Sequence, residues 1–248
     1  MSVIAIGDIH GQSEALRDLL VQILPELRQE DTLVFLGDYI DRGPHSRECV
    51  DQIIRLKAES PCPVITLLGN HEQWMLRSLN DPTRHSWLIG MDALETIKNY
   101  SEEAASQIAK ALDEYGARLF TMRIALPYHL FLHAMPREHL EFFLHLETYY
   151  REDGIICVHG GVDLEGIVDP VDVNTCVWGP SGFPEEYSGE DAVVYGHRHN
   201  AVVNDDGSIQ PCIGSNKTYG IDTISHGVLT ALRLPDGKIF QSAKHATG

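Results

Sequence analysis

The chain has 248 residues, a formal net charge of −17 at pH 7, 43% hydrophobic residues and 22% charged residues. This length is enough for one large domain with a substantial core, and we expect a single domain over residues 1–248. The negative charge disfavours a surface that docks on a nucleic-acid backbone. No stretch approaches the roughly 18 uninterrupted apolar residues of a membrane span. We therefore expect neither nucleic-acid binding nor insertion into a membrane.

The N-terminus and the cysteines favour a cytoplasmic protein. The start of the chain, MSVIAIGDIHG, has no basic region and only a short apolar run before charge appears, unlike a signal peptide or an anchor. The five cysteines are odd in number and contain no C-x-x-C pair, which argues against a disulfide framework and against a cysteine zinc site. We expect reduced thiols, mostly in the core.

The first third of the chain alternates strand and helix patterns. β-Branched runs predict strands at VIAIG, TLVFLG and PVITLLG, and apolar residues at helical spacing predict helices over residues 13–24 and 47–57. Ser13 is the expected N-cap of the first helix, with Glu14 in its first turn. This βαβαβ pattern predicts an α/β sheet with reactive loops at the carboxyl ends of its strands.

The rest of the chain divides into a helical part and a strand-rich part. From Glu72 to about Tyr150 the pattern is mainly helical, which predicts a helical insertion or cap at about residues 80–150. After Gly154 short strand-type runs return, with turn residues at 204–207 and 235–237 between the later ones. These runs are IICVHGG, VDVNTCVWG, DAVVYGH, SIQPCIG, GVLTALRL and KIFQSA.

Five clusters share a pattern of an apolar run, a glycine turn and side chains that bind metal ions. They are IGDIHG (Asp8, His10), LGDYIDRG (Asp38, Asp41, Arg42), LGNHE (Asn70, His71, Glu72), CVHGG (His159) and VYGHRH (His197, His199). One such string occurs in loops for turn reasons alone, but five in succession favour a site. Carboxylate, imidazole and amide ligands suit manganese, iron or zinc. Six ligands exceed the needs of one four-coordinate zinc and favour two ions about 3.5–4 Å apart that share Asp38.

The ordered motifs G-D-x-H-G, G-D-x-x-D-R-G, G-N-H-E, H-G-G and G-H resemble those of the calcineurin-like metallophosphoesterases. Within that superfamily the chain looks most like the bacterial members of the phosphoprotein (Ser/Thr) phosphatase family, and the segments MPREHLEFFLHL and IDTISHGVLTALRL extend the likeness. The resemblance implies an α/β sandwich of two mixed β-sheets flanked by helices, with a helical insertion.

The resemblance also implies roles for individual residues. The first metal would be held by Asp8, His10 and Asp38, and the second by Asp38, Asn70, His159 and His197. The catalytic residues would be His71, Asp41 and Arg42: Asp41 orients His71, which gives a proton to the leaving group, and Arg42 binds the substrate phosphate. The implied reaction is direct in-line attack by a hydroxide that bridges two divalent ions, with Mn2+ favoured and Fe or Zn as alternatives.

The chain departs from the family pattern in its phosphate-binding arginines. Leu68 stands where many members have an arginine before the G-N-H-E glycine, and the tryptophan-containing segment reads VWGPSGF. Arg198 is a candidate for the missing charge, so the candidate substrate-binding residues are Arg42, Asn70 and Arg198. The alternative for Arg198 is a solvated surface group.

Several other residues favour structural roles. Glu72 is expected to start a helix or support the ligands rather than bind metal, and His199 to lie at the surface or behind the ligands. Trp74, Met75 and Trp87 are expected in the core, with a substrate groove as the alternative. The histidines of the helical region are expected to be exposed or hydrogen-bonded: His129, His133, His139 and His145.

These observations leave three hypotheses for function. The first is a metal-dependent phosphatase acting on phosphoserine or phosphothreonine in proteins. The second keeps the chemistry but takes a dinucleoside polyphosphate such as diadenosine tetraphosphate. The third is a metal-bearing scaffold without turnover, which the presence of Asp41, Arg42 and His71 argues against. We expect residues from about 80 to 136 to select the substrate, because the metal core is common to all these reactions. The oligomeric state is left open.

Overall fold

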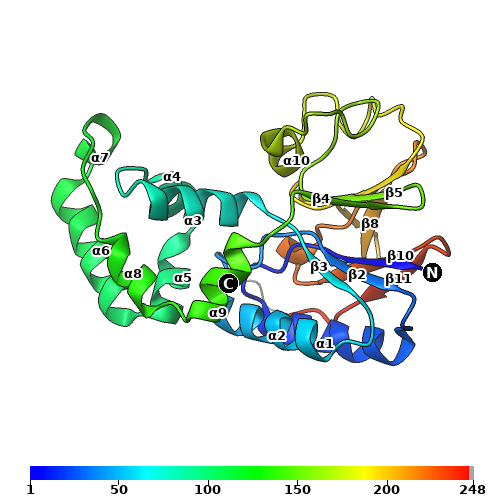
Figure 1. Ribbon diagram of the computed structural model, residues 1–248, viewed down its shortest axis with the longest axis horizontal. Helices are drawn as coiled ribbons and strands as arrows, with labels where there is room; N and C mark the ends of the chain where they lie inside the picture. The colour runs from blue at the N-terminus through cyan, green and yellow to red at the C-terminus, as the bar shows by residue number, and fades with distance from the viewer. Residues whose placement is uncertain (246–248) are drawn as a thin grey trace.

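The computed structural model describes residues 1–245. Two mixed β-sheets pack face to face, helices cover their outer faces, and a group of helices extends to one side (Figure 1). This arrangement confirms the predicted α/β sandwich of two mixed sheets. Within the described range no helix is both long and apolar enough to cross a membrane.

The first sheet confirms the predicted βαβαβ unit. Its three parallel strands are β1 (Val3–Ile6), β2 (Thr32–Phe35) and β3 (Val64–Thr66), and β10 (Thr230–Leu234) and β11 (Lys238–Gln241) extend it in the order β11-β10-β1-β2-β3. The connections contain α1 (Ser13–Ile23), the 3-10 turn η1 (Leu24–Glu26) and α2 (Ser46–Glu59). The predicted N-cap was wrong by one residue. Gln12 occupies that position, and Ser13 instead donates its hydroxyl to Glu48, 3.0 Å away.

The second sheet follows the order β4-β5-β6-β9-β8-β7. Its central strands β5, β6 and β9 are parallel, and the outer strands pair antiparallel. The 3-10 turn η2 (Ile224–His226) leads from this sheet back to the first. The strands are β4 (Tyr149–Glu152), β5 (Ile155–Val158), β6 (Ala192–Tyr195), β7 (Ala201–Val203), β8 (Ile209–Ile213) and β9 (Thr218–Gly220).

One predicted strand is a helix. The run VDVNTCVWG is rich in β-branched residues and was predicted as a strand, but the structure forms α10 (Val173–Trp178) there. Asp172 occupies the N-cap and accepts a hydrogen bond from the backbone N–H of Asn174 at 3.0 Å. Such a cap satisfies a free donor of the first turn, and the buried Cys176 packs on the outer face of the second sheet.

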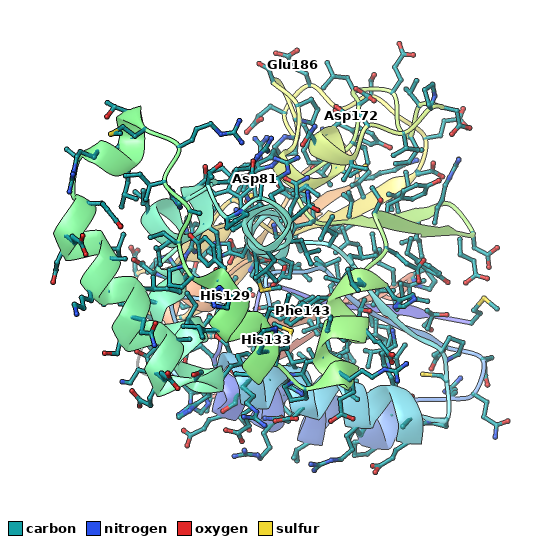
Figure 2. The ribbon with its side chains drawn as sticks, turned by 60° about the vertical axis from the view of Figure 1, so that its left-hand side comes forward. Asp81, His129, His133, Phe143, Asp172 and Glu186 are labelled. Atoms are coloured by element: carbon teal, nitrogen blue, oxygen red, sulfur yellow. The ribbon has the colours of Figure 1, made fainter. Side chains whose placement is uncertain are left out.

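The helices that lie between β3 and β4 in the sequence extend into the lobe at the left of Figure 1. We call residues 80–150 the helical segment. It begins at the last residue of α3, the helix that leads into it. The helices are α3 (Asn70–Asn80), α4 (Ser86–Gly90), α5 (Ala93–Tyr100), α6 (Glu102–Tyr115), α7 (Arg118–Thr121), α8 (Tyr128–Ala134) and α9 (Arg137–Leu144). His129 and His133 lie exposed on the outer side of α8 (Figure 2), and His145 is exposed as well, as expected.

The core lies on both faces of the first sheet. In β1, Val3 and Ala5 pack between the two sheets, whereas Ile4 and Ile6 pack against the helices. Burial on both faces is typical of parallel strands covered by helices or another sheet, and it holds the ends of these strands rigidly. All five cysteines are free thiols, and only Cys212 is exposed, which confirms the expectation for the thiols.

Candidate active site

The predicted site residues meet at one edge of the two sheets. Each comes from a loop at the carboxyl end of a strand, and the carboxyl ends of neighbouring parallel strands lie together. Asp8 and His10 follow β1; Asp38, Asp41 and Arg42 follow β2; Asn70, His71 and Glu72 open α3 after β3; His159 follows β5; and His197 follows β6.

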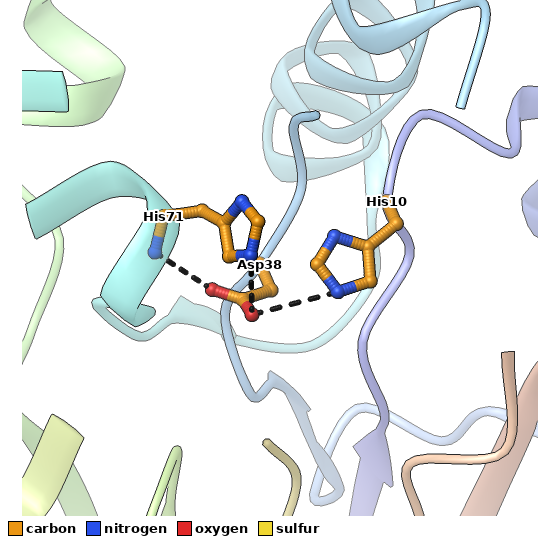
Figure 3. A group of neighbouring side chains, drawn as sticks. All are labelled: His10, Asp38 and His71. Atoms are coloured by element: carbon orange, nitrogen blue, oxygen red, sulfur yellow. Dashed lines mark hydrogen bonds and ion pairs between the residues drawn. The ribbon is translucent and has the colours of Figure 1, made fainter. Parts of the chain in front are cut away.

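Asp38 lies at the centre of this group. Its Oδ2 atom is 3.6 Å from His10 Nε2 and 3.8 Å from His71 Nε2 (Figure 3), and its Oδ1 atom is 3.4 Å from His159 Nε2. The carboxylate is 2% exposed. Its two oxygens therefore face different histidines, as a carboxylate shared by two ions requires.

The buried histidines present nitrogen lone pairs to Asp38. His10 Nδ1 is 3.1 Å from the carbonyl oxygen of Ile40, and His159 Nδ1 is 3.1 Å from that of Leu36. A carbonyl can only accept, so each Nδ1 carries the proton and each Nε2 keeps the lone pair that a metal ion can take up. Burial lowers the pKa of both imidazoles well below the usual value, which favours the neutral form that binds metal.

Asn70 contacts His159 and His197, which follow strands of the second sheet. Its Oδ1 atom lies 2.9 Å from His159 Nε2 and 3.0 Å from His197 Nδ1. One ligand atom each from Asp38, His159 and His197 falls within 4.8 Å of the others, and the same holds for His10, Asp38 and His71. The side chains thus form two groups that share Asp38.

Asp8 and Asp222 complete the acidic part of the site. Asp8 accepts the backbone N–H of His197 at 3.0 Å, which links the loops after β1 and β6. Asp222, which the sequence reasoning missed, follows β9 and accepts the backbone N–H of His199 at 2.8 Å. Its other oxygen is buried without a hydrogen-bond partner among the described residues. The string Gly220-Ile221-Asp222 after a strand-type run repeats the pattern of the five clusters and could have revealed it.

The electrostatics of these residues favour a bound cation. Burial raises the pKa of Asp8, Asp38 and Asp222, and repulsion between the carboxylates adds to the shift for Asp8 and Asp38. The positive charge of Arg42 acts in the opposite direction on the pKa of all three carboxyl groups. Since buried charges need a compensating charge, and the donors are oxygens and neutral imidazole nitrogens, these residues fit divalent ions such as manganese, iron or zinc.

Glu72 supports the loop that carries Asp38. Its carboxylate accepts the backbone N–H groups of Asp38 and Tyr39, each at 2.9 Å. The side chain is fully buried, and burial raises its pKa to about 7. These contacts agree with a supporting carboxylate rather than a ligand.

Asp41 and His71 form a buried pair beside Asp38. His71 Nδ1 lies 2.7 Å from Asp41 Oδ2, and both side chains are completely buried. His71 Nε2 has no hydrogen-bond partner among the described residues and faces Asp38. Two further side chains bind the Asp41 carboxylate: Trp87, which was expected in the core or a substrate groove, and Thr96, which the sequence analysis did not single out. Such a pair can deliver a proton from Nε2 while Asp41 fixes the ring.

The two candidate arginines differ in their surroundings. Arg42 is exposed, and its guanidinium lies 3.1 Å from His10 Nε2, next to the predicted metal ligands. Arg198 instead donates to the backbone carbonyls of Phe183 at 2.5 Å and Pro180 at 3.3 Å. These bonds tie Arg198 to the loop after α10, so its contacts do not support the predicted phosphate-binding role.

Two tryptophans flank the site. Trp178 packs edge-on against His197, with ring centroids 5.5 Å apart, and lies 5.0 Å from Trp74. Both line a hollow of about 500 Å3 together with Arg77 and Asp172. Asp172 is the N-cap of α10 and is labelled in Figure 2. Trp74 is half-buried: it packs against the core and also lines this hollow, so it agrees with both positions that the sequence left open. Met75 and Trp87 are fully buried, as expected.

Comparison with known proteins yields a family match. A family model described as "Calcineurin-like phosphoesterase" matches residues 1–201. The zinc-dependent endopolyphosphatase of Saccharomyces cerevisiae is 28% identical over 111 residues, which are 43% of this chain and 33% of that protein. The serine/threonine-protein phosphatase SIT4 of Candida albicans is 39% identical over 72 residues, 28% of this chain and 23% of that protein. The matched segments span a third or less of these relatives.

Solved structures share the fold over the whole chain. A candidate diadenosine tetraphosphatase superposes with a TM-score of 0.62 at 20% identity, covering 100% of this chain and 95% of the other. A protein serine/threonine phosphatase from Saccharomyces cerevisiae gives a TM-score of 0.53 at 16% identity and covers 99% and 81%. At these identities the likeness is one of fold.

Proposed function

The chain belongs to the calcineurin-like phosphoesterase family, and from that premise we propose that it is a dinuclear metal-dependent phosphomonoester hydrolase. Its leading substrate is phosphoserine or phosphothreonine in proteins, as for the bacterial phosphatases that its motifs resemble. The observation that carries the proposal is the position of Asp38. Its two oxygens face different histidines beside the buried Asp41–His71 pair.

The proposed ligands are the two sets that the motifs imply. Two divalent ions, with manganese proposed, would be held by Asp8, His10 and Asp38 on one side and by Asp38, Asn70, His159 and His197 on the other. When bound, they supply Lewis acidity to the phosphate oxygens and lower the pKa of water to about 7.

The remaining residues bind the phosphate and move a proton. Arg42 offers its planar set of donors to the phosphoryl oxygens at the mouth of the site. Burial lowers the pKa of His71, so in this proposal the negative charge of Asp41 has to hold the ring as an imidazolium. His71 then gives its Nε2 proton to the leaving oxygen, and Asp41 holds Nδ1 so that the ring stays oriented. A leaving alkoxide gains most from this proton, because an alkoxide is a strong base.

A second candidate substrate is a dinucleoside polyphosphate. This candidate is favoured by the hollow that Trp74, Trp178 and Arg77 line. The hollow lies beside the predicted metal ligands, because the ring of Trp178 packs against that of His197. Stacking of an aromatic ring on a nucleobase contributes about 1–3 kcal/mol of binding free energy per base. Arg77 would contact a phosphate of the leaving nucleotide. The fold shared with a candidate diadenosine tetraphosphatase gives this candidate further support.

One experiment separates these substrates. Purified protein loaded with manganese is given a phosphothreonine peptide and diadenosine tetraphosphate under the same conditions, with Trp74→Ala as a matched variant. Faster turnover of the peptide, unchanged in Trp74→Ala, supports the protein phosphatase. Faster turnover of the dinucleotide, with KM raised in Trp74→Ala, supports the second candidate. If neither turns over while two ions are bound, the hydrolase proposal fails and the scaffold hypothesis replaces it.

A further inference from the structure

Two side chains of the helical segment hold the carboxylate of Asp41. Trp87, on α4, donates its indole N–H to Asp41 Oδ2 at 2.8 Å. Thr96, on α5, donates its hydroxyl to Asp41 Oδ1 at 2.6 Å and accepts the backbone N–H of Asp41 at 2.9 Å. Both side chains are completely buried. With His71, three donors therefore surround one carboxylate.

The backbone at Asp41 needs such support. Asp41 has a φ of 69°, in the left-handed region, which costs roughly 1–2 kcal/mol in a residue other than glycine. Ser46, at the start of α2, accepts the Asp41 N–H at 3.1 Å, and its Oγ lies 2.9 Å from Thr96 Oγ1. Strained conformations persist where their surroundings hold them. Here hydrogen bonds to Ser46 of α2 and Thr96 of α5 hold the loop after β2 in place.

Trp87 is itself fixed by the packing of the helical segment. Its ring lies 5.5 Å from Phe131 and 6.2 Å from Tyr128, centroid to centroid, and both residues belong to α8. An indole packed this way cannot rotate its N–H away from Asp41 without disturbing the core. The position of the Asp41 carboxylate therefore depends on helices outside the two sheets.

The hydrogen bonds also counter the cost of burying a carboxylate. Burial raises the pKa of Asp41 to about 8, and the hydrogen bonds from Thr96 and Trp87 act in the opposite direction. A buried carboxylate with all its donors in place is a stable acceptor for His71 Nδ1, whereas one that lacks a donor turns or takes another partner.

We propose that Trp87 and Thr96 are positioning residues that aim the Asp41–His71 pair at the leaving group. The helical segment would then be part of the catalytic apparatus as well as a wall for the substrate. The inference rests on the proposed phosphatase function.

The test compares leaving groups. Trp87→Phe keeps an aromatic ring but removes the N–H, and Thr96→Val keeps the shape but removes the hydroxyl. Each is expected to lower kcat on a phosphothreonine peptide by roughly 10–100-fold, part of what a general acid contributes. Hydrolysis of p-nitrophenyl phosphate, whose leaving group needs no proton, is expected to fall far less. Thr96→Ser restores the hydroxyl and is expected to restore the rate.

Tyr128→Phe is the matched control. It alters the same aromatic cluster but leaves the donors to Asp41 intact, so the ratio of the two rates should stay at the wild-type value. Equal losses on both substrates in Trp87→Phe and Thr96→Val, or no loss on either, would overturn the positioning role. Metal content is measured for every variant, because lost ions would lower both rates together.

A second readout does not depend on turnover. The Nδ1 proton of His71 is observed by NMR in the zinc-loaded protein and assigned by its loss in His71→Asn. We expect it to shift in Trp87→Phe and Thr96→Val and to return in Thr96→Ser. An unchanged resonance in both variants would contradict the inference even if the wild type hydrolyses no phosphomonoester. Absence of any hydrolysis by a two-metal wild type, in contrast, counts against the proposed function alone.

Discussion

At the scale of single residues, backbone strain gathers where the chemistry is. Among residues 1–245, nine residues other than glycine have a positive φ. Six of these belong to the site loops: His10, Asp38, Asp41, Arg42, His197 and His199. Left-handed residues of this kind are uncommon and concentrate at functional sites. Each lies in the loop that follows β1, β2 or β6, where the chain turns after a buried strand.

Asp38 allows a sharp test at this scale. Asparagine tolerates a φ of 51° and its oxygen can still accept the N–H of His71, so Asp38→Asn should keep the loop while removing the charge. We expect metal affinity to fall by more than about 100-fold and activity to be lost with it, as measured by metal analysis and kinetics. His71→Asn should keep both ions and lose rate on the phosphothreonine peptide. Two tightly bound ions in Asp38→Asn would contradict the shared-ligand role.

At the scale of elements, a buried histidine fastens the helical segment to the rest of the fold. His139 of α9 lies 2.8 Å from the hydroxyl of Tyr100 on α5 and 2.9 Å from Asp51 on α2. The imidazole is completely buried, so its two hydrogen bonds join three helices. This is the satisfied histidine that the sequence suggested, with partners that the sequence could not name.

Removing these hydrogen bonds should lower the free energy of unfolding but leave the residues of the candidate active site unchanged. His139→Leu leaves the Tyr100 hydroxyl and Asp51 without their partner and is expected to lower the free energy of unfolding by roughly 1–3 kcal/mol, as measured by urea titration. The exposed neighbour Glu138 provides the control, since Glu138→Gln should change stability by less than about 0.5 kcal/mol. Equal stability of the two variants would show that the three-helix link does not hold the segment in place.

At the scale of the whole molecule, the two sheets bring buried acidic residues together in a chain that already carries a net charge of −17. Asp8 and Asp38 come from the first sheet and Asp222 follows the second, and repulsion among them disfavours the folded state unless a cation lies between them. Metal binding and folding should therefore be coupled.

Metal removal measures that coupling. A chelator is expected to lower the unfolding temperature. Free manganese at about 100 times its dissociation constant should then raise the free energy of unfolding by about 2.7 kcal/mol, which corresponds to a rise in the unfolding temperature of about 5–10 °C for a chain of this size. The same concentration of potassium chloride controls for screening of the net charge. Asp38→Asn should show little response to manganese. If manganese leaves the wild-type unfolding temperature unchanged, the proposed ions do not bind the folded site.

The sequence alone determined the order of strands and helices in the first third and the types of residue that form the candidate metal centre. It could do so because these features are local: a buried run, a glycine turn and the ligands lie within a few positions of one another. Only the tertiary structure decided the rest. It brought Trp87 and Thr96 to Asp41 from more than forty positions away, bound Arg198 to backbone carbonyls, and set Trp178 beside His197. It also made a helix where a short β-branched run predicted a strand, because the Asp172 cap and packing on the second sheet outweigh the preference of a few residues. Contacts between distant segments depend on how helices pack on sheets, and no local pattern encodes that packing.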